Sequence, residues 1–180
     1  MPVYVALLRA VNLGPHNRIS MPELRAAIES TGATNVRTLL QSGNAVFESK
    51  ARSPAAVATA VAGALERAHG LATGTFVRAA AAWRAAVDAN PFPDAAKADP
   101  SHLVLMPLTA RPTAAAFAAL QAAIPGRERV ALVGSDLYLH YPDGIGTSKL
   151  SNALLERKLG VSGTGRNWNT TLKILALMEA

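Results

Sequence analysis

The order of short β-type runs and amphipathic helical segments is the feature of this 180-residue chain that most constrains its fold. In the first 89 residues, runs rich in β-forming residues alternate with segments whose apolar side chains recur at helical spacing. The expected strands are 3–9, 36–41, 45–49 and 73–78, and the expected helices are 22–31, 54–70 and a segment through Trp83 and Val87. This β-α-β-β-α-β order predicts a ferredoxin-like subdomain with a four-stranded antiparallel sheet.

Residues that cap helices and form turns separate these segments. Ser20 before Pro22 and Glu23 indicates a helix start, because Ser is a preferred cap and Pro fits the first turn. Ser42-Gly43-Asn44 joins the two middle strands, where Gly and Asn supply the positive φ angles of a tight hairpin.

The second half of the chain repeats part of this order. Pro and acidic residues in 90–101 are typical of a linker. Beyond it we expect strands at 103–108, 129–133 and 137–141, a helix at 112–124, and C-terminal helices at 149–159 and 167–178. The chain is therefore predicted to be an α+β protein of two fused subdomains. Residues 1–89 form the ferredoxin-like one, and residues 102–180 form a βαββ unit with C-terminal helices.

Composition narrows the class of protein. The chain has no Cys, which excludes disulfides, thiolate chemistry and Cys-ligated metals and fits a reducing compartment. The first apolar run is too short for a membrane span and has no basic region before it, so we expect a cytoplasmic protein without a membrane partner. The net charge of +6 suits a polyanionic partner, although the basic residues are scattered and compositional bias explains them equally well.

Five short segments together resemble one known family. They are Leu7–Asn12, Leu40–Phe47, Asn90-Pro91-Phe92, Leu155-Glu156-Arg157, and Thr164 with Arg166–Thr170. In this order they resemble the bacterial family catalogued as domain of unknown function 1697. The resemblance implies an α+β fold and carries no established activity, substrate or catalytic residue.

The chain departs from the usual family pattern in its first loop. Ala10 and Pro15 stand where relatives usually have Gly. Pro15 has no N–H to donate, which argues against a phosphate cradle of backbone amides in this loop.

The segment Thr164–Thr171 is the first candidate for a ligand site. It places Arg166, Asn167 and Asn169 at an expected helix start, where free N–H groups and the helix dipole favour anions. The alternative is structural: Trp168 anchors the helix in the core while Asn167 and Thr164 cap it.

Two further segments contribute candidate ligand-binding residues. Arg9 and Asn12 lie at the end of the first strand and in the loop after it, a common place for binding residues. Gln41, Ser42 and Asn44 offer hydrogen-bonding side chains at the hairpin turn, although turn formation alone accounts for Gly43 and Asn44.

No metal site or cofactor is predicted. His16, His69, His102 and His140 are far apart in sequence and form no ligand motif, and no acidic cluster offers a cation site. Tyr4 and Phe47 are better explained as core residues than as base-stacking rings, because the basic and aromatic RNA-binding pattern is missing.

Three functional hypotheses remain open. In the first, the protein binds an anionic or phosphorylated ligand, such as a nucleotide or a nucleic-acid end, in a cleft between the subdomains where the three segments converge. In the second, it is an enzyme acting on a small phosphorylated substrate, with His16, Glu48 or Glu156 as the base. In the third, it is a structural or interaction protein without a small-molecule ligand.

Overall fold

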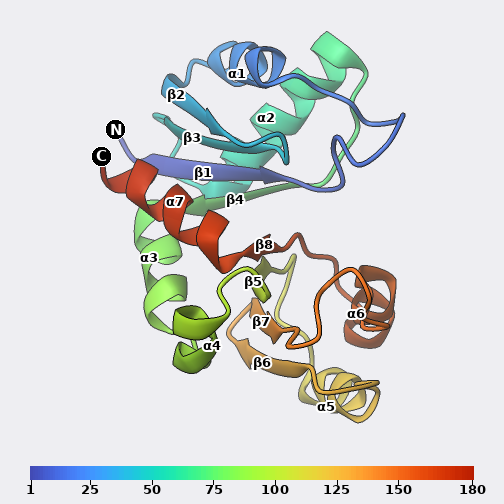
Figure 1. The fold of residues 1–180 in the computed structure, drawn as a ribbon. Coiled ribbons are helices and arrows are strands. Elements are labelled where there is room, and N and C mark those ends of the chain that lie inside the picture. The colour runs from blue at the N-terminus through green and yellow to red at the C-terminus, as the bar shows by residue number, and fades with distance from the viewer. The chain divides into compact units, whose positions relative to one another are not determined.

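The structure, a computed structural model, describes residues 1–180 and divides into two compact units. The first unit is Met1–Ala85 with Lys173–Ala180, and the second unit is Ala86–Leu172. Figure 1 labels the helices and strands in chain order. Two helices, α3 (Ala80–Asp88) and α7 (Trp168–Glu179), contribute residues to both units.

The first unit contains a four-stranded antiparallel sheet in the order β2-β3-β1-β4. Its elements are β1 (Val3–Leu8), α1 (Met21–Glu29), β2 (Thr34–Leu39), β3 (Asn44–Glu48), α2 (Pro54–His69) and β4 (Thr75–Ala79). The predicted β-α-β-β-α-β order is confirmed, and the strand order is that of a ferredoxin-like fold.

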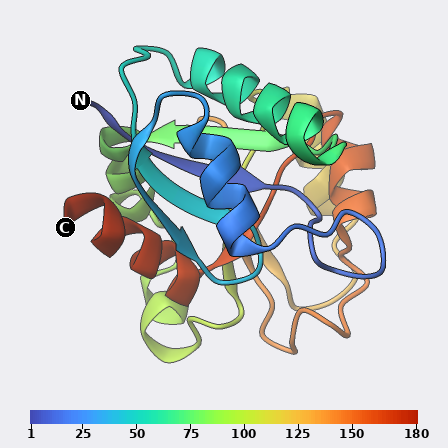
Figure 2. The ribbon, with the colours of Figure 1, turned by 90° about the horizontal axis from the view of Figure 1, so that it is seen from above.

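The core of the first unit lies between this sheet and helices α1 and α2, which cover one of its faces (Figures 1 and 2). Alternate residues of β1 point to this face, as the period of two in a strand requires. The buried cluster includes Tyr4, Ala6 and Leu8 of β1, Phe47 of β3, Leu24 and Ile28 of α1, and Val57, Val61 and Leu65 of α2. Ser20 and Ser53 cap the two helices.

The C-terminal residues of α7 belong to the first unit. The Arg37 guanidinium on β2 donates a hydrogen bond to the Leu177 carbonyl at 2.6 Å. Arg84 of α3 pairs with Glu179, with 2.9 Å between Nε and the carboxylate. These contacts fix the last turns of α7 within this unit.

The second unit has the same topology as the first. Its elements are α4 (Pro93–Ala98), β5 (Leu103–Pro107), α5 (Ala114–Ala122), β6 (Arg129–Val133), β7 (Asp136–His140), α6 (Asn152–Leu159) and β8 (Arg166–Asn167). The antiparallel sheet has the order β6-β7-β5-β8, which matches the order of the first sheet strand for strand. Leu120 of α5 and Leu155 of α6 pack with alternate residues of β5 and β7 in its core. The predicted α+β class with two fused subdomains is confirmed.

The fourth strand of this sheet was not predicted, because the C-terminal helix was expected to begin at about Asn167. Instead Arg166 and Asn167 form β8, which pairs with Leu105 and Val104 of β5, and α7 begins at Trp168. Gly165 makes this pairing possible, because a Cβ there would lie 2.7 Å from the Val104 Cγ1 atom. Two residues are too few to show a strand period.

Two further local predictions need correction. The hairpin loop is 40–43 rather than Ser42-Gly43-Asn44: Leu40 and Gly43 have φ of 59° and 77°, and Asn44 pairs with Leu39 as the first residue of β3. The predicted linker 90–101 contains α4, because Pro93 occupies the first turn of a helix, where its missing N–H costs nothing. The domain boundaries 1–89, 90–101 and 102–180 stay a prediction.

Gly43 offers a test of the close packing between the hairpin loop and β1. A Cβ at this position would lie 2.8 Å from both Leu8 Cβ and Val11 Cγ2, and its φ is positive. We expect Gly43→Ala to lower the free energy of unfolding by about 2 to 4 kcal/mol, through backbone strain and overpacking. Urea unfolding followed by circular dichroism measures this change.

Gly14→Ala is the matched control, because a Cβ there meets nothing within 4 Å and no positive φ is required. We expect a change within about 0.5 kcal/mol for this variant. Equal effects of the two substitutions would contradict the packing argument.

Candidate functional site

Asn12 organises the loop that follows β1. Its backbone is left-handed, with φ of 57°, a conformation that Asn tolerates better than most residues. Its Nδ2 donates to the Ile19 carbonyl at 2.8 Å and to the Gln41 carbonyl at 2.7 Å, and its Oδ1 accepts the Ile19 N–H at 2.9 Å. Both amide protons of Asn12 are therefore used within the protein. The side chain joins the loop to the hairpin and has only acceptor capacity left for a ligand.

Asn44 has a similar internal role in the hairpin. Its side chain is fully buried, and Nδ2 donates to the Leu39 carbonyl at 2.8 Å and to the Ser42 hydroxyl at 2.9 Å. These bonds hold the hairpin loop closed next to the Leu39–Asn44 pair, where the β2–β3 ladder begins. Gln41 and Ser42, by contrast, are exposed on the loop.

Arg9 directly follows β1 and is partly buried. Its N–H donates to the Gly74 carbonyl at 2.9 Å, and its carbonyl accepts a hydrogen bond from the Thr73 hydroxyl. The backbone of Arg9 is thus held on the segment that leads into β4.

A pocket of about 520 Å³ lies beside the start of α1 in the first unit. It is lined by Asn12, Arg18, Ile19, Ser20, Glu23 and Gln41. Two of the three segments predicted to share a site, the loop after β1 and the hairpin loop, are brought together here by the Asn12 side chain.

The polar and charged side chains of this pocket differ in whether they form hydrogen bonds or ion pairs within the protein. The Glu23 carboxylate accepts the Ser20 N–H at 2.8 Å, and this hydrogen bond lowers its pKa, so the carboxylate is ionised at neutral pH. Arg18 is exposed and forms no hydrogen bond or ion pair with the rest of the chain. Gln41 contributes its carbonyl to Asn12, while its side-chain amide is unengaged. Arg18 and Gln41 therefore present the available donors. Arg18 belongs to the loop whose donors suit a phosphate or carboxylate, but it was not among the predicted ligand-binding residues.

The three candidates at the start of α7 lie in the second unit and differ in exposure. Arg166 is only 8% exposed, and its Nη1 donates to the Thr164 hydroxyl and the Gly165 carbonyl, both at 2.9 Å. Burial lowers its pKa to about 10, which leaves the guanidinium protonated at neutral pH. Asn167 caps the helix by accepting the Thr170 N–H at 2.9 Å, whereas Asn169 is exposed. Convergence of this segment with the first-unit pocket stays a prediction.

The bases suggested for an enzyme do not line the first-unit pocket. His16 is exposed in the loop after β1, and Glu48 accepts a hydrogen bond from Asn35 at 2.8 Å. Glu156 lies on α6 in the second unit.

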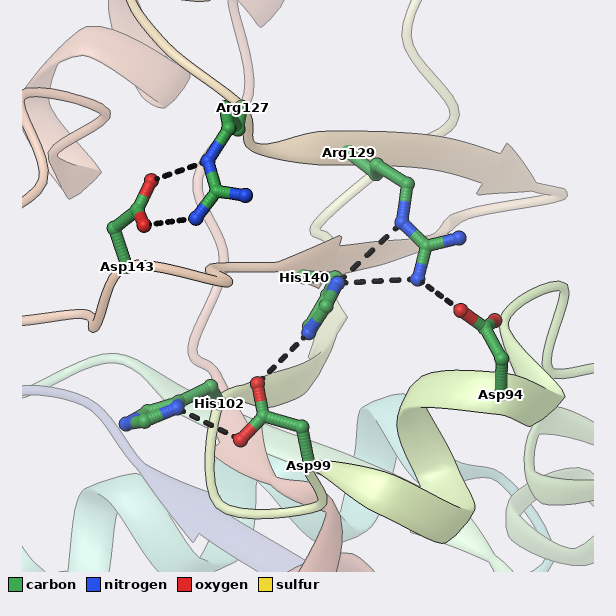
Figure 3. Close-up of polar contacts among 7 residues, drawn as sticks. All are labelled: Asp94, Asp99, His102, Arg127, Arg129, His140 and Asp143. Carbon is green, nitrogen blue, oxygen red and sulfur yellow. Dashed lines mark hydrogen bonds and ion pairs between the residues drawn. The ribbon is translucent and has the colours of Figure 1, made fainter.

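A polar network that the sequence analysis missed crosses the second unit (Figure 3). The Asp99 carboxylate lies between two imidazoles, 2.8 Å from His102 Nδ1 and 2.9 Å from His140 Nε2. The Arg129 guanidinium approaches the other nitrogen of His140 at 3.1 Å and donates to Asp94 at 2.7 Å. The hydrogen bond from His140 is the main cause that lowers the pKa of Asp99.

One signal for this network was available in the sequence. The expected strands 129–133 and 137–141 around Gly134-Ser135-Asp136 place Arg129 near the far end of the second strand. The observed turn is one residue shorter, so that Val133 pairs with Asp136 and Arg129 with His140. No signal indicated that Asp99 would reach them, because it ends a helix in the segment predicted as a linker.

The chain has neither a metal-binding cluster nor a helix that could span a membrane. No group of three or more His, Cys, Asp or Glu side chains is placed to hold a metal ion. None of the helices has both the length and the apolar character needed to cross a membrane.

The fold and these sites define an α+β protein made of two ferredoxin-like units. The chain belongs to the family described as "Protein of unknown function (DUF1697)", whose model matches residues 1–138. This match ends before Thr164, so the family role of the Thr164–Thr171 segment stays a prediction.

One solved structure shares the fold over almost the whole chain. It is described as that of the conserved bacterial protein SP0830 from Streptococcus pneumoniae, with a TM-score of 0.76 and 18% sequence identity over 98% of each chain. Curated proteins gave no match to the chain.

The pKa of Asp99 leads to a prediction about stability and pH. Because the folded pKa is lowered, Asp99 stabilises the fold above the ordinary carboxylate pKa, and this contribution is lost as the pH falls through the folded pKa. We expect Asp99→Asn to be less stable than the unmodified protein at neutral pH, with a difference that shrinks in acid. Urea unfolding over a range of pH measures it.

Asp143→Asn is the control for a general effect of charge. Asp143 pairs with Arg127, but both side chains are more than half exposed, with 63% and 72% of their surface accessible. Solvent screens such a pair, so we expect a smaller change. A difference between Asp99→Asn and the unmodified protein that does not vary with pH would contradict the prediction.

Proposed function

We propose that this protein binds a small ligand with an anionic group, such as the phosphate of a nucleotide or of a nucleic-acid end, in the first-unit pocket. The observation that carries the proposal is the unengaged Arg18 guanidinium at a pocket of about 520 Å³ whose walls are fixed by Asn12. This volume falls in the usual range for small-molecule sites, roughly 300 to 1,000 Å³. The net charge of +6 also favours the approach of an anion.

The pocket lining favours a ligand that is more than a simple anion. Arg18 offers a planar set of donors that suits phosphate or carboxylate. Glu23 also lines the pocket, and its ionised carboxylate attracts a hydrogen-bond donor and repels a second negative group. A nucleotide supplies both features, with its phosphate toward Arg18 and a sugar hydroxyl or base amino group toward Glu23.

The start of α1 does not by itself provide the anion site. Glu23 and Ser20 form a reciprocal capping box, so the N–H groups of Ser20 and Glu23 already have partners. Arg18 and Gln41 are therefore expected to give the main contacts, with Ser42 beside Gln41 on the loop. Arg166, Asn167 and Asn169 belong to the second unit, and a part for them in binding stays a prediction.

A thermal-shift screen with nucleotides, sugar phosphates, inorganic phosphate and short RNA and DNA tests this proposal. A ligand at a concentration of a hundred times its Kd stabilises the folded state by about 2.7 kcal/mol. This stabilisation is readily measured as a rise in Tm. We expect a nucleotide to raise the Tm more than inorganic phosphate does. Arg18→Gln should abolish this rise and leave the Tm of the free protein unchanged, because Arg18 has no partner in the fold.

Arg52→Gln is the matched control, because it removes the same charge from an exposed residue that does not line the pocket. It should leave most of the ligand-induced rise in Tm intact. A screen in which no compound raises the Tm, or equal losses in the two variants, would contradict the proposal.

A further inference from the structure

The direction of the hydrogen bonds in the second-unit network follows from the chemistry of arginine. The Nε and Nη2 atoms of Arg129 lie 3.4 and 3.1 Å from His140 Nδ1, and a guanidinium can only donate. Nδ1 of His140 must therefore be the acceptor, and the ring proton lies on Nε2. That proton is donated to the Asp99 carboxylate across 2.9 Å. These contacts fit the tautomer of His140 that carries its proton on Nε2, and the residue is only 8% exposed.

The second oxygen of Asp99 fixes His102 in the opposite tautomer. His102 Nδ1 lies 2.8 Å from Asp99 Oδ1, so the Nδ1 proton is donated to the carboxylate (Figure 3). Nε2 of His102 then keeps its lone pair and has no partner in the chain. The His102 side chain is 40% exposed, so the ring is partly accessible to solvent.

Backbone hydrogen bonds and the His140 contact hold the segment from Asp99 to His102 in addition to the contact between the Asp99 and His102 side chains. The turn between them is closed by the His102 N–H on the Asp99 carbonyl at 3.1 Å. The His102 carbonyl in turn accepts the N–H of Tyr141, the residue after β7, at 2.9 Å. Asp99 is in addition tied to β7 by the His140 side chain. The turn is therefore held by backbone hydrogen bonds, and Asp99 orients the partly exposed His102 ring with its Nε2 atom away from the carboxylate.

We propose that His102 is a general acid–base residue that takes a proton at Nε2 from a hydroxyl group, with water as the simplest reactant. Asp99, whose side chain is 31% exposed, positions the ring and stabilises the imidazolium that forms, as a carboxylate does for histidine in hydrolases. His140 and Arg129 are positioning residues that keep Asp99 aimed at His102. This site lies in the second unit and does not rest on the ligand proposed for the first-unit pocket.

The expected reaction is hydrolysis of an activated ester. A water molecule gives a proton to Nε2 as its oxygen bonds to the acyl carbon. The tetrahedral adduct then expels the alcohol as an oxyanion, which breaks the ester bond. The imidazolium returns the proton to the leaving group or to solvent, so the histidine is regenerated and no other reactant is consumed.

Hydrolysis of p-nitrophenyl acetate by the full chain is a direct test. His16→Ala and His69→Ala serve as controls, because both histidines are exposed and lack a hydrogen-bonded carboxylate. We expect His102→Ala to lower the rate by about tenfold or more, and the two controls to change it by less than about twofold. His102→Gln, which keeps a donor for Asp99, should lose the same activity without loss of fold. Equal losses at His16 or His69 would overturn the proposal.

Asp99→Asn tests the positioning role with His102 still present. We expect the rate to fall by about tenfold, whereas Asp143→Asn, which removes the same charge from an exposed ion pair, should leave it unchanged. Nitrogen NMR spectra of the rings should show the Nδ1–H tautomer for His102 and the Nε2–H tautomer for His140 in the unmodified protein. An Nε2–H tautomer at His102, or an Asp99→Asn protein with the full rate, would refute the assignment.

Discussion

Pairing of the central strands on both of their sides is the constraint on which the structure depends. β1 pairs with β3 and β4, and β5 pairs with β7 and β8, so neither central strand can shift without breaking two ladders. In the first unit, the register places Leu7 of β1 opposite Asn44 of β3. The loop after β1 and the hairpin loop therefore leave the same end of the sheet, which is why Asn12 can reach the Gln41 carbonyl. The pocket beside α1 follows from this register.

Periodicity and turn chemistry were enough to predict most of the fold. The first unit has long amphipathic helices and β-rich runs, and its element order was predicted correctly. The errors fall on elements that are too short to show a period, namely the two-residue β8 and the six-residue α4. β8 also depends on a tertiary contact, because the chain at Gly165 must come close to Val104 of β5 for β8 to pair. A contact between residues this far apart in the chain cannot be predicted from the local sequence around Gly165.

The candidate sites were less predictable than the fold, because residue type does not reveal which polar atoms are already engaged. Asn12 and Asn44 were proposed as ligand contacts, yet both donate their amide protons to backbone or hydroxyl groups of the same unit. Arg18 was not selected as a ligand contact, although it is the lining cation without a partner. The histidines were judged by spacing alone, whereas the network depends on the end of α4 and on the β6–β7 register. Prediction of such a site requires the ladder register before the side chains are considered.

The last residues of the chain, Lys173–Ala180, belong to the first unit, and this affects the order in which the units can be completed during synthesis. All four strands of the first sheet lie within the first 85 residues and can pair as soon as they leave the ribosome. However, the partner of Arg37, the Leu177 carbonyl, lies 140 residues later in the chain. The partner of Arg84, Glu179, lies 95 residues later. The entropy lost on closing such a loop grows only slowly with its length, so a long delay costs little at equilibrium. Its effect is on timing, because the first unit reaches its final form only after the whole second unit has been made.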